Sequence, residues 1–342
     1  MTALQRTATA PADSGLVTID AIRAAARLLD GVALRTPLVG FGAGQPPVLL
    51  KAESLQPIGA FKIRGAYVAV ASLSDDERRR GVITYSSGNH AQGVARAAQI
   101  LGAPAVVVMP SDAPAIKRAR VERDGAEIVV VGTASEERRM VAEQLAAERG
   151  LTVIPPYDDD RIIAGQGTVG LEIVEAVPDV ALVVVPIGGG GLAAGVATAV
   201  KAVRRTARVV GVEPALAADA AESLATGRIV EWPSEKVSRT IADGTRTQAL
   251  GRRTFAHLRA YLDRIVTVSE AEIAFAVRQA AEESRLVVEP SGALGIAALR
   301  RLFDAEAARI DGPIVVVVSG GNVDPHRYRA LLEAPEPRVV DG

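Results

Sequence analysis

Residues 182–191 have the sequence Leu-Val-Val-Val-Pro-Ile-Gly-Gly-Gly-Gly, an uncharged apolar run that ends in four consecutive glycines. An apolar run without polar alternation is typical of a parallel strand that is buried on both faces. Residues 180–200 as a whole carry no charge and could cross a bilayer by length alone. Pro186 and the glycines would interrupt a spanning helix, however. We therefore predict a strand, a loop and then a helix that begins near Leu192.

Similar apolar runs recur along the chain, and most of them are followed by a segment with a helical pattern. They are residues 82–85, 105–109, 128–131, 209–212 and 314–318. This alternation predicts an α/β fold of parallel sheets wrapped by helices and joined by right-handed crossovers. The chain has 342 residues, more than one domain usually holds. We expect a disordered tail at residues 1–15, a large domain formed by 16–81 and 153–342, and a small domain at 82–152.

The composition makes several classes of function improbable. A formal net charge of -1 gives no electrostatic reason to expect nucleic acid or an acidic membrane as a partner. The chain has no cysteine and 3 histidines, so we expect no disulfide, no thiolate nucleophile and no metal site with several histidine ligands. The N-terminal residues lack the basic and apolar regions of a signal peptide. We therefore expect a cytoplasmic protein.

Residues 59–66, Gly-Ala-Phe-Lys-Ile-Arg-Gly-Ala, set Lys62 among mostly small and apolar neighbours. A surface lysine ordinarily has polar neighbours, so this setting favours an amine that takes part in chemistry. Residues 86–93, Ser-Ser-Gly-Asn-His-Ala-Gln-Gly, follow one predicted strand and open a helix. Free backbone N–H groups at such a position attract a carboxylate or a phosphate. The alternative is that Ser87 or Asn89 only caps the helix.

The four glycines at 188–191 would let a phosphate approach the backbone at the start of a helix, although a tight packing turn is the simpler alternative. A later loop, Ser-Gly-Gly-Asn at residues 319–322, also follows an apolar strand. A lysine amine, a loop of hydroxyls and amides, a glycine cradle and a late serine are together what a protein needs to hold pyridoxal phosphate.

A different class of protein also fits part of this pattern. Gly188, Gly190 and Ala193 match G-x-G-x-x-A after a strand, and Glu213 ends the next strand, which is typical of an oxidoreductase that binds NAD. That hypothesis gives no role to Lys62 or to the other two loops, so it explains less of the chain.

The four segments together resemble the fold-type II pyridoxal phosphate enzymes, which have a two-lobed fold like that of the tryptophan synthase β subunit. Within them the chain is most similar to the threonine dehydratase and serine racemase group. The resemblance runs from Ile19 to Asp324 and includes residues 53–56, 110–114, 162–168 and 288–293. It implies an ammonia-lyase that converts a β-hydroxy amino acid, first of all L-threonine or L-serine, into a 2-oxo acid and ammonia. It also suggests a homodimer.

The resemblance implies a role for each site residue. Lys62 would form the internal aldimine and later take the α-proton, and Phe61 and Gly244 would sandwich the cofactor ring. Asn89 would bond the ring hydroxyl and Ser319 the ring nitrogen; a neutral serine there favours β-elimination over transamination. The phosphate would be held by Gly188, Gly189, Gly190, Gly191 and Leu192, and the substrate by Ser86, Ser87, Asn89 and His90.

Ser87 leaves the reaction partly open. Threonine dehydratases often carry alanine at this position, whereas serine racemases and hydroxyaspartate lyases carry a serine that acts as a second base. Ser87 is either such a base or a residue that contacts the substrate carboxylate or caps the helix. Serine racemase and threo-3-hydroxyaspartate ammonia-lyase are therefore the alternatives. Ser54, Ile58 and Ala60 depart from the usual asparagine, threonine and serine, so the motifs leave the substrate unassigned.

Residues 213–219 resemble the divalent cation site of the same group. Glu213 and Asp219 would supply carboxylates and Ala217 a backbone carbonyl, and such oxygen ligands suit Mg²⁺ or Ca²⁺. Without the resemblance, two carboxylates near a loop would be interpreted as solvated surface groups.

Overall fold

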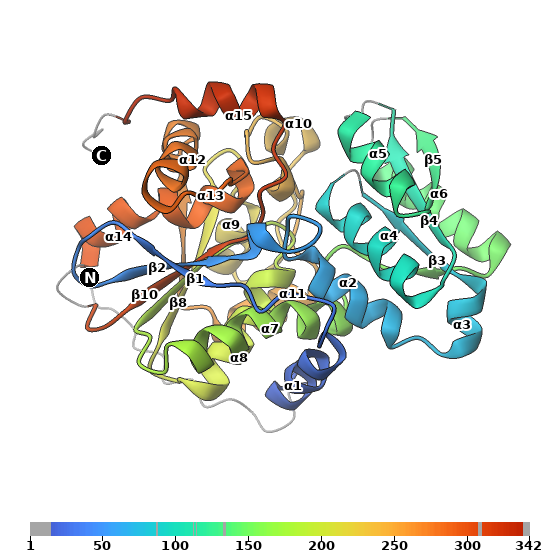
Figure 1. The fold of residues 1–342 in the computed structure, drawn as a ribbon, viewed down its shortest axis with the longest axis horizontal. Coiled ribbons are helices and arrows are strands. Elements are labelled where there is room, and N and C mark those ends of the chain that lie inside the picture. Colours follow the sequence, from blue (N-terminus) through green and yellow to red (C-terminus); the bar gives the residue numbers. More distant parts are fainter. Residues whose placement is uncertain are drawn as a thin grey trace.

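The computed structural model describes residues 15–86, 88–111, 113, 115–132, 135–306 and 310–337, and within them it contains two separate sheets (Figure 1). The predicted tail lies outside these ranges, apart from Gly15. The larger sheet has the spatial order β1 (Leu38–Phe41), β2 (Val48–Ala52), β10 (Ile314–Val318), β7 (Leu182–Pro186), β8 (Arg208–Pro214) and β9 (Arg264–Val268). The smaller sheet has the order β5 (Glu127–Val131), β4 (Ala105–Pro110), β3 (Val82–Tyr85) and β6 (Thr152–Val153).

All six predicted apolar runs form strands, and the predicted α/β class with parallel sheets is confirmed. One pair differs, because β1 and β2 run antiparallel at the edge of the larger sheet. A connection of a few residues between them is enough for a hairpin, whereas a parallel pair needs a long crossover. Strands β1, β2, β6 and β9 were not predicted from the sequence.

The larger sheet is apolar on both faces because helices cover both. Val315 and Val317 of β10 belong to the core cluster beneath α7 (Asp160–Ala176) and α8 (Gly191–Val203). The alternate residues Val316 and Val318 belong to the cluster beneath the helices on the opposite face. Successive side chains of a strand point to opposite faces of its sheet. Because both faces are covered here, apolar residues occupy every position instead of alternating with polar ones.

The remaining helices complete these layers. On the larger sheet and between the sheets they are α1 (Ile19–Leu28), α2 (Lys62–Ala71), α9 (Asp219–Thr226), α10 (Ser234–Val237), α11 (Arg252–Tyr261), α12 (Glu270–Ser284), α13 (Pro290–Ala297), α14 (Leu299–Glu306) and α15 (Pro325–Leu332), with short 3₁₀ turns η1 (Glu53–Leu55) and η2 (Asp243–Thr245). The short helix α3 (Asp75–Arg80) lies beside the smaller sheet (Figure 1). Around the smaller sheet they are α4 (Asn89–Leu101), α5 (Ala115–Arg123) and α6 (Ser135–Arg149). In the described part of the chain no helix has both the length and the apolar composition to cross a bilayer.

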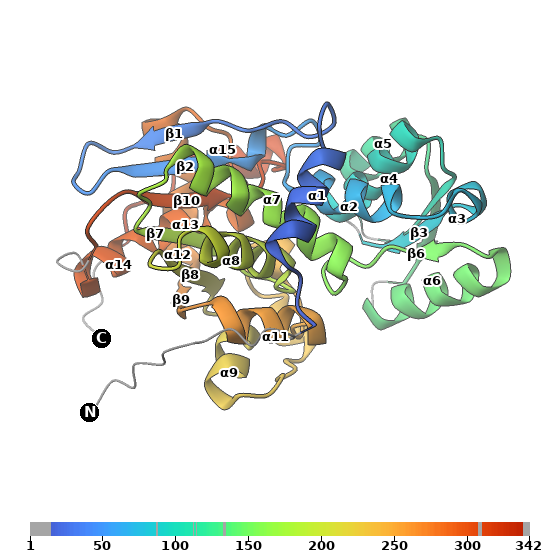
Figure 2. The same cartoon turned by 90° about the horizontal axis from the view of Figure 1, so that it is seen from below.

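The smaller sheet and its helices lie to one side of the larger sheet, as Figure 2 shows from below. β6 pairs with β3, so the smaller sheet extends to Val153, one residue past the predicted limit of the small domain. We propose that the two domains follow the two sheets, with α2 and the segment after β6 as the connections between them.

Candidate active site

The segment that carries Lys62 is joined to the loop that follows β10. The backbone N–H of Phe61 donates to the carbonyl of Ser319 at 3.0 Å, and the N–H of Gly321 donates to the carbonyl of Gly59 at 2.9 Å. Lys62 itself is the first residue of α2. The structure therefore brings together two motifs that lie more than 250 residues apart in the sequence.

The Lys62 amine lies in a partly buried position, and its described contacts include no carboxylate. Its Nζ donates to the backbone carbonyl of Pro156 at 2.6 Å, and it lies 5.2 Å from the centre of the Phe61 ring. Loss of surrounding water lowers the pKa of Lys62 to about 8. A lysine with such a pKa is partly neutral near pH 7.5, as a nucleophile or a proton acceptor must be.

Asn89 is the first residue of α4, and its side chain does not cap that helix. Gly88 occupies the N-cap position. The Asn89 amide instead donates to Glu289 at 2.6 Å and accepts from Asn322 at 2.9 Å. One N–H of the amide nitrogen is then left for a further acceptor. Ser86 accepts a long hydrogen bond of 3.4 Å from the N–H of Gly88. Ser87 lies outside the described residues.

His90 follows Asn89 in α4, and its side chain is buried. Its side chain is 2% exposed, and its Nε2 lies 3.0 Å from the carbonyl of Ile154. Burial, with the charge of Lys62 as a second cause, lowers the pKa of His90 to about 3. The imidazole is therefore a neutral buried group that joins α4 to the segment after β6. A substrate at the start of α4 could meet only the backbone N–H of His90.

The buried neutral His90 predicts a dependence of stability on pH. Its folded pKa lies below the ordinary value of 6.5, so below pH 6.5 the unfolded chain binds a proton that folded His90 does not bind. This residue therefore removes stability as the pH falls, by about 1.4 kcal/mol per unit. We expect the stability advantage of the wild type over His90→Gln, measured by urea unfolding, to narrow between pH 7 and pH 5.5. An advantage that does not change with pH would contradict this assignment.

Glu289 is a site residue for which the sequence suggested no role. It is 4% exposed at the start of α13 and accepts from Asn89. Burial, together with the nearby charge of Asp243, raises the pKa of Glu289 to about 7. Asn322 also bonds Arg120 of α5 and donates to the carbonyl of Ile58 at 2.8 Å. Glu289 lies 200 residues from Asn89 in the sequence, so no local pattern could have paired them.

Gly188, Gly189 and Gly190 lie between β7 and α8, Gly191 is the first residue of α8, and each of the four has a close protein neighbour. A Cβ on Gly189 would lie 2.1 Å from the Tyr157 ring, one on Gly188 would lie 3.1 Å from Thr245, and Gly190 has a φ of 90°. Packing and backbone conformation therefore favour glycine at these positions without a ligand, and four glycines in a row are not independent support for a phosphate. The start of α8, a helix of 13 residues, still presents free N–H groups to an anion. The Leu192 side chain is buried in the core, so only its backbone could contact a ligand.

Gly244 and Ser319 occupy the remaining predicted positions. The N–H of Gly244 donates to Ser291 Oγ at 2.8 Å, which joins η2 to the start of α13. Ser319 follows directly after β10 and is 5% exposed. The carbonyl of Gly244 lies 3.3 Å from where a Cβ of Gly188 would lie, and the carbonyl of Ser319 accepts from Phe61, so both residues lie beside other predicted site residues.

The residues predicted to bind a cation form a buried acidic pair. Glu213 accepts the N–H groups of Ala220 and Ala221 at the start of α9, at 3.1 and 2.8 Å. Both carboxylate oxygens of Asp219 are buried without a hydrogen-bond partner. Burial raises the pKa of Asp219 to about 7, and burial with the charge of Asp219 raises the pKa of Glu213 well above its ordinary value. Ala217 is 1% exposed. In the described ranges no group of three or more histidine and acidic side chains could hold a metal.

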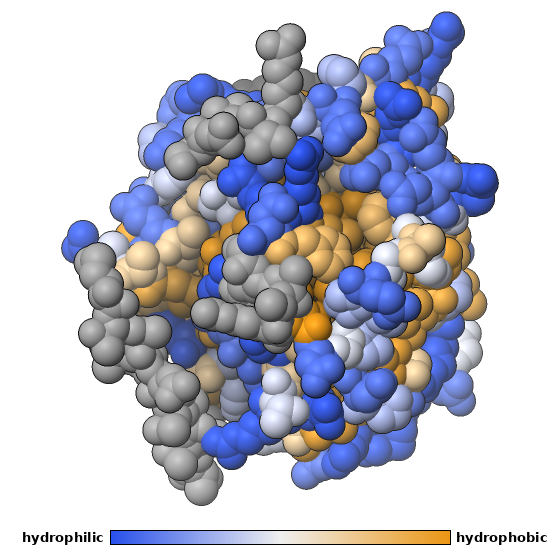
Figure 3. Space-filling view, turned by 90° about the vertical axis from the view of Figure 1, so that its left-hand side faces the viewer, coloured by the Kyte–Doolittle hydropathy of each residue, from blue (hydrophilic) through white to orange (hydrophobic). Residues whose placement is uncertain are grey.

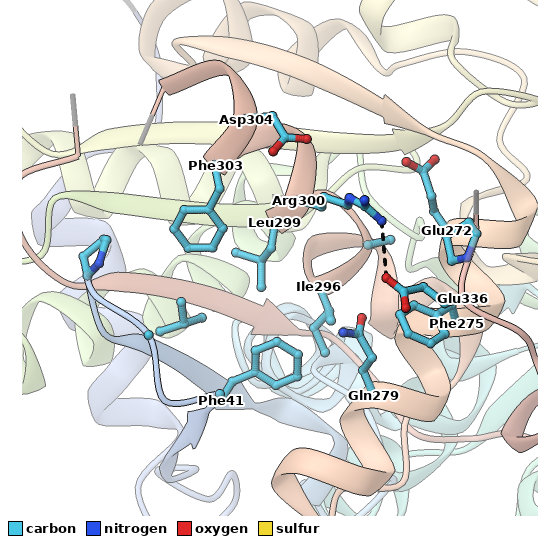
Figure 4. A pocket seen from close by; sticks show the side chains of 16 residues that line it. Phe41, Glu272, Phe275, Gln279, Ile296, Leu299, Arg300, Phe303, Asp304 and Glu336 are labelled. Atoms are coloured by element: carbon cyan, nitrogen blue, oxygen red, sulfur yellow. Dashed lines mark hydrogen bonds and ion pairs between the residues drawn. The ribbon is translucent and has the colours of Figure 1, made fainter. Parts of the chain in front are cut away.

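A cavity of about 360 Å³ lies away from all of these residues. Phe41, Phe275 and Phe303 line it between the β1–β2 hairpin and helices α12 to α14 (Figure 4). Figure 3 views the molecule from this side and shows hydrophobic residues gathered among hydrophilic ones. A smaller cavity of about 70 Å³ is lined by Glu289 and Asn322, the partners of Asn89. We therefore locate the candidate site by the contacts among the segments of Lys62, Asn89 and Ser319, and not by the size of a cavity.

Comparison with known proteins shows which family the chain resembles. Residues 30–320 match the model of a family described as "Pyridoxal-phosphate dependent enzyme". The chain is 43% identical over 290 residues to an L-threo-3-hydroxyaspartate ammonia-lyase of Saccharomyces cerevisiae, covering 84% of this chain and 87% of that protein. It is 40% identical to an L-threonine ammonia-lyase of Thermotoga maritima, covering 90% of this chain and 76% of that protein.

Solved structures give the same result. A threonine deaminase from T.th. has 44% identity and a TM-score of 0.82, and the match covers 90% of this chain and 99% of that one. Maize serine racemase has 39% identity and a TM-score of 0.87, covering 92% of this chain and 96% of that one.

Proposed function

The chain belongs to the pyridoxal-phosphate dependent enzyme family, and from this premise we propose that it is an ammonia-lyase that acts on a small β-hydroxy amino acid. The products would be a 2-oxo acid and ammonia, with L-threonine and L-serine as the first candidate substrates. The observation that supports this most is the desolvated amine of Lys62, which donates to the carbonyl of Pro156 and lies on a segment that is hydrogen-bonded to the loop after β10. The residue after Pro156, Tyr157, packs on Gly189 in the loop after β7. The dinucleotide hypothesis is not retained, because Glu213 is buried against the start of α9 and is not available to a ribose.

The residues present fit pyridoxal phosphate. Lys62 is bonded to a backbone carbonyl and not to a carboxylate, so its amine can be released without breaking an ion pair. Asn89 has one N–H left for a ring oxygen, and the start of α8 suits a phosphate. Ser319 offers a neutral hydroxyl. We propose that these residues hold the cofactor, with Phe61 and Gly244 on the two faces of its ring.

The proposed reaction needs a proton acceptor and an anchor for the substrate carboxylate. The cofactor, when bound, withdraws electrons from the α-carbon and so makes its C–H bond acidic. Lys62 in its neutral form would take that proton at Nζ, and its lowered pKa keeps much of it neutral near pH 8. Backbone N–H groups at the start of α4 would hold the substrate carboxylate and orient the C–H bond.

A product assay tests this proposal. The full chain should release ammonia and a 2-oxo acid in equal amounts from L-threonine or L-serine. Relatives named serine racemase and L-threo-3-hydroxyaspartate ammonia-lyase, together with Ser87, support two further candidates. Chiral analysis of serine and an assay with L-threo-3-hydroxyaspartate separate them. Release of no 2-oxo acid from any of these amino acids would overturn the ammonia-lyase assignment.

We also propose that Glu213, Asp219 and the carbonyl of Ala217 bind Mg²⁺ or Ca²⁺. Two buried carboxylates close together repel each other unless a cation or protons neutralise them. Asp219 has two buried oxygens without donors, which are the atoms a hard cation would bind. Water molecules would complete the coordination.

Cation binding should be visible as thermal stability. We expect Mg²⁺ at a hundred times its dissociation constant to stabilise the wild type by about 2.7 kcal/mol, measured as a rise in Tm against Na⁺ of equal ionic strength. Asp219→Asn should lose this rise and should be more stable than the wild type without Mg²⁺, because one buried negative charge is gone. An equal rise in both proteins would contradict the site.

A further inference from the structure

The connection between β6 and α7 contacts both the lysine and the glycine loop. Pro156 accepts the Lys62 amine through its backbone carbonyl, at 2.6 Å. The next residue, Tyr157, packs its ring directly on Gly189, and its backbone lies 3.2 Å from where a Cβ of Gly191 would lie. Burial raises the pKa of Tyr157 to about 12, so its hydroxyl stays neutral. This short connection also leads from the smaller sheet to the larger one.

The third residue of the connection, Asp158, holds the start of α11. Its carboxylate accepts the backbone N–H groups of Arg252, Arg253 and Thr254 at 3.1, 2.8 and 3.2 Å. The residue at the N-cap of α11 is Gly251, which has no side chain to cap the helix. A Cβ on Gly251 would lie 2.1 Å from the Asp158 carboxyl carbon, so glycine is required for this approach. Asp158 therefore replaces the missing cap from 93 residues away.

Helix α11 in turn fixes one peptide of the glycine loop. Thr254 is fully buried, and its hydroxyl donates to the carbonyl of Gly189 at 2.8 Å, with a longer contact of 3.1 Å to the carbonyl of Gly251. In a planar trans peptide the carbonyl and the following N–H point in opposite directions. A carbonyl of Gly189 that points to Thr254 therefore directs the N–H of Gly190 to the other side of the loop.

We propose that Asp158 and Thr254 are positioning residues for the glycine loop. Asp158 holds the start of α11, Thr254 on that helix orients the Gly189–Gly190 peptide, and the oriented N–H of Gly190 is presented to the phosphate of the cofactor. This inference rests on the proposed function. Because the N–H of Gly190 is already oriented, no free energy is needed to turn it when the phosphate binds. Thr254 can therefore raise the affinity for the phosphate without touching it.

The test compares a ligand that has the phosphate with one that lacks it. Thr254→Val removes the hydroxyl at nearly constant shape, and Thr254→Ser keeps it. Dissociation constants for pyridoxal phosphate and for pyridoxal are measured by absorption titration of the cofactor-free full chain. We expect Thr254→Val to weaken pyridoxal phosphate about tenfold, the effect of about 1.4 kcal/mol for one hydrogen bond, and to leave pyridoxal nearly unchanged. Thr254→Ser should keep most of the wild-type preference for pyridoxal phosphate over pyridoxal.

Asp158→Ala is an independent variant, because it removes the cap of α11 and keeps the Thr254 hydroxyl. It should lower the preference for the phosphate in the same direction. Equal losses for both ligands, or wild-type preference in Thr254→Val and Asp158→Ala, would overturn the inference. If Thr254→Val does not fold, the inference is decided by Asp158→Ala and Thr254→Ser. It then requires a lowered preference for pyridoxal phosphate over pyridoxal in Asp158→Ala and a preference near that of the wild type in Thr254→Ser. A wild-type chain that binds neither ligand would instead contradict the proposed function.

Discussion

Replacing Lys62 with alanine is expected to abolish turnover of every β-hydroxy amino acid that the wild type accepts. The variant loses the amine that would both join the cofactor and take the α-proton, and proton transfer by a positioned side chain alone contributes about 10²- to 10⁴-fold. The loss should be in turnover and not in folding, because the described contacts of the Lys62 amine are one hydrogen bond and a distant ring. Initial rates of 2-oxo acid release and the thermal midpoint measure the two properties.

A matched control is Lys201→Ala. Lys201 lies in the last turn of α8, ten residues from Gly191, and its half-buried amine is 2.7 Å from Asp263. This variant should keep wild-type turnover. Turnover within tenfold of the wild type in Lys62→Ala would show that Lys62 does not have the role assigned to it.

Replacing Arg64 with methionine should cause the largest loss of stability. Arg64 is 1% exposed and makes two hydrogen bonds to each of two carboxylates, those of Glu53 and Glu172, at 2.6 to 3.0 Å. Lys51 completes the cluster at 2.5 Å from Glu172, so two positive charges balance two negative ones. Removing one cation leaves an unbalanced buried carboxylate, which costs about 3–5 kcal/mol. Urea unfolding measures this loss.

A double variant separates charge balance from packing. Arg64→Met with Glu53→Gln removes one charge of each sign, so its loss should be smaller than the sum of the two single losses. Arg64→Lys keeps the charge but not the forked geometry and should fall between wild type and Arg64→Met. Losses that add would show that the charges of Arg64 and Glu53 do not interact.

The parts of the fold that the sequence could predict are those whose pattern is local. Residues 182–187 and 314–318 are apolar at every position because both faces of their strands are covered, and this property is visible in the sequence itself. β9 could not be found in this way, because most of its residues are only half-buried. The antiparallel β1 was missed for a related reason, since only Phe41 of its four residues is buried.

The candidate site divides in the same manner. Lys62, Asn89 and the glycines belong to short motifs, so they could be selected from the sequence. Asp158 and Thr254 lie in no such motif, because each acts through a contact about 65 to 95 residues away in the sequence. The burial of the His90 side chain against Ile154 was likewise not visible in the sequence, because it depends on how α4 packs.

The absorption spectrum of the purified full chain, recorded before and after addition of L-threonine, L-serine or L-threo-3-hydroxyaspartate, tests the central claim most directly. We predict a visible band from pyridoxal phosphate joined to Lys62, and a change in that band with at least one of the three amino acids. A chain that stays colourless after pyridoxal phosphate is added, or a band that none of the three changes, would contradict the account.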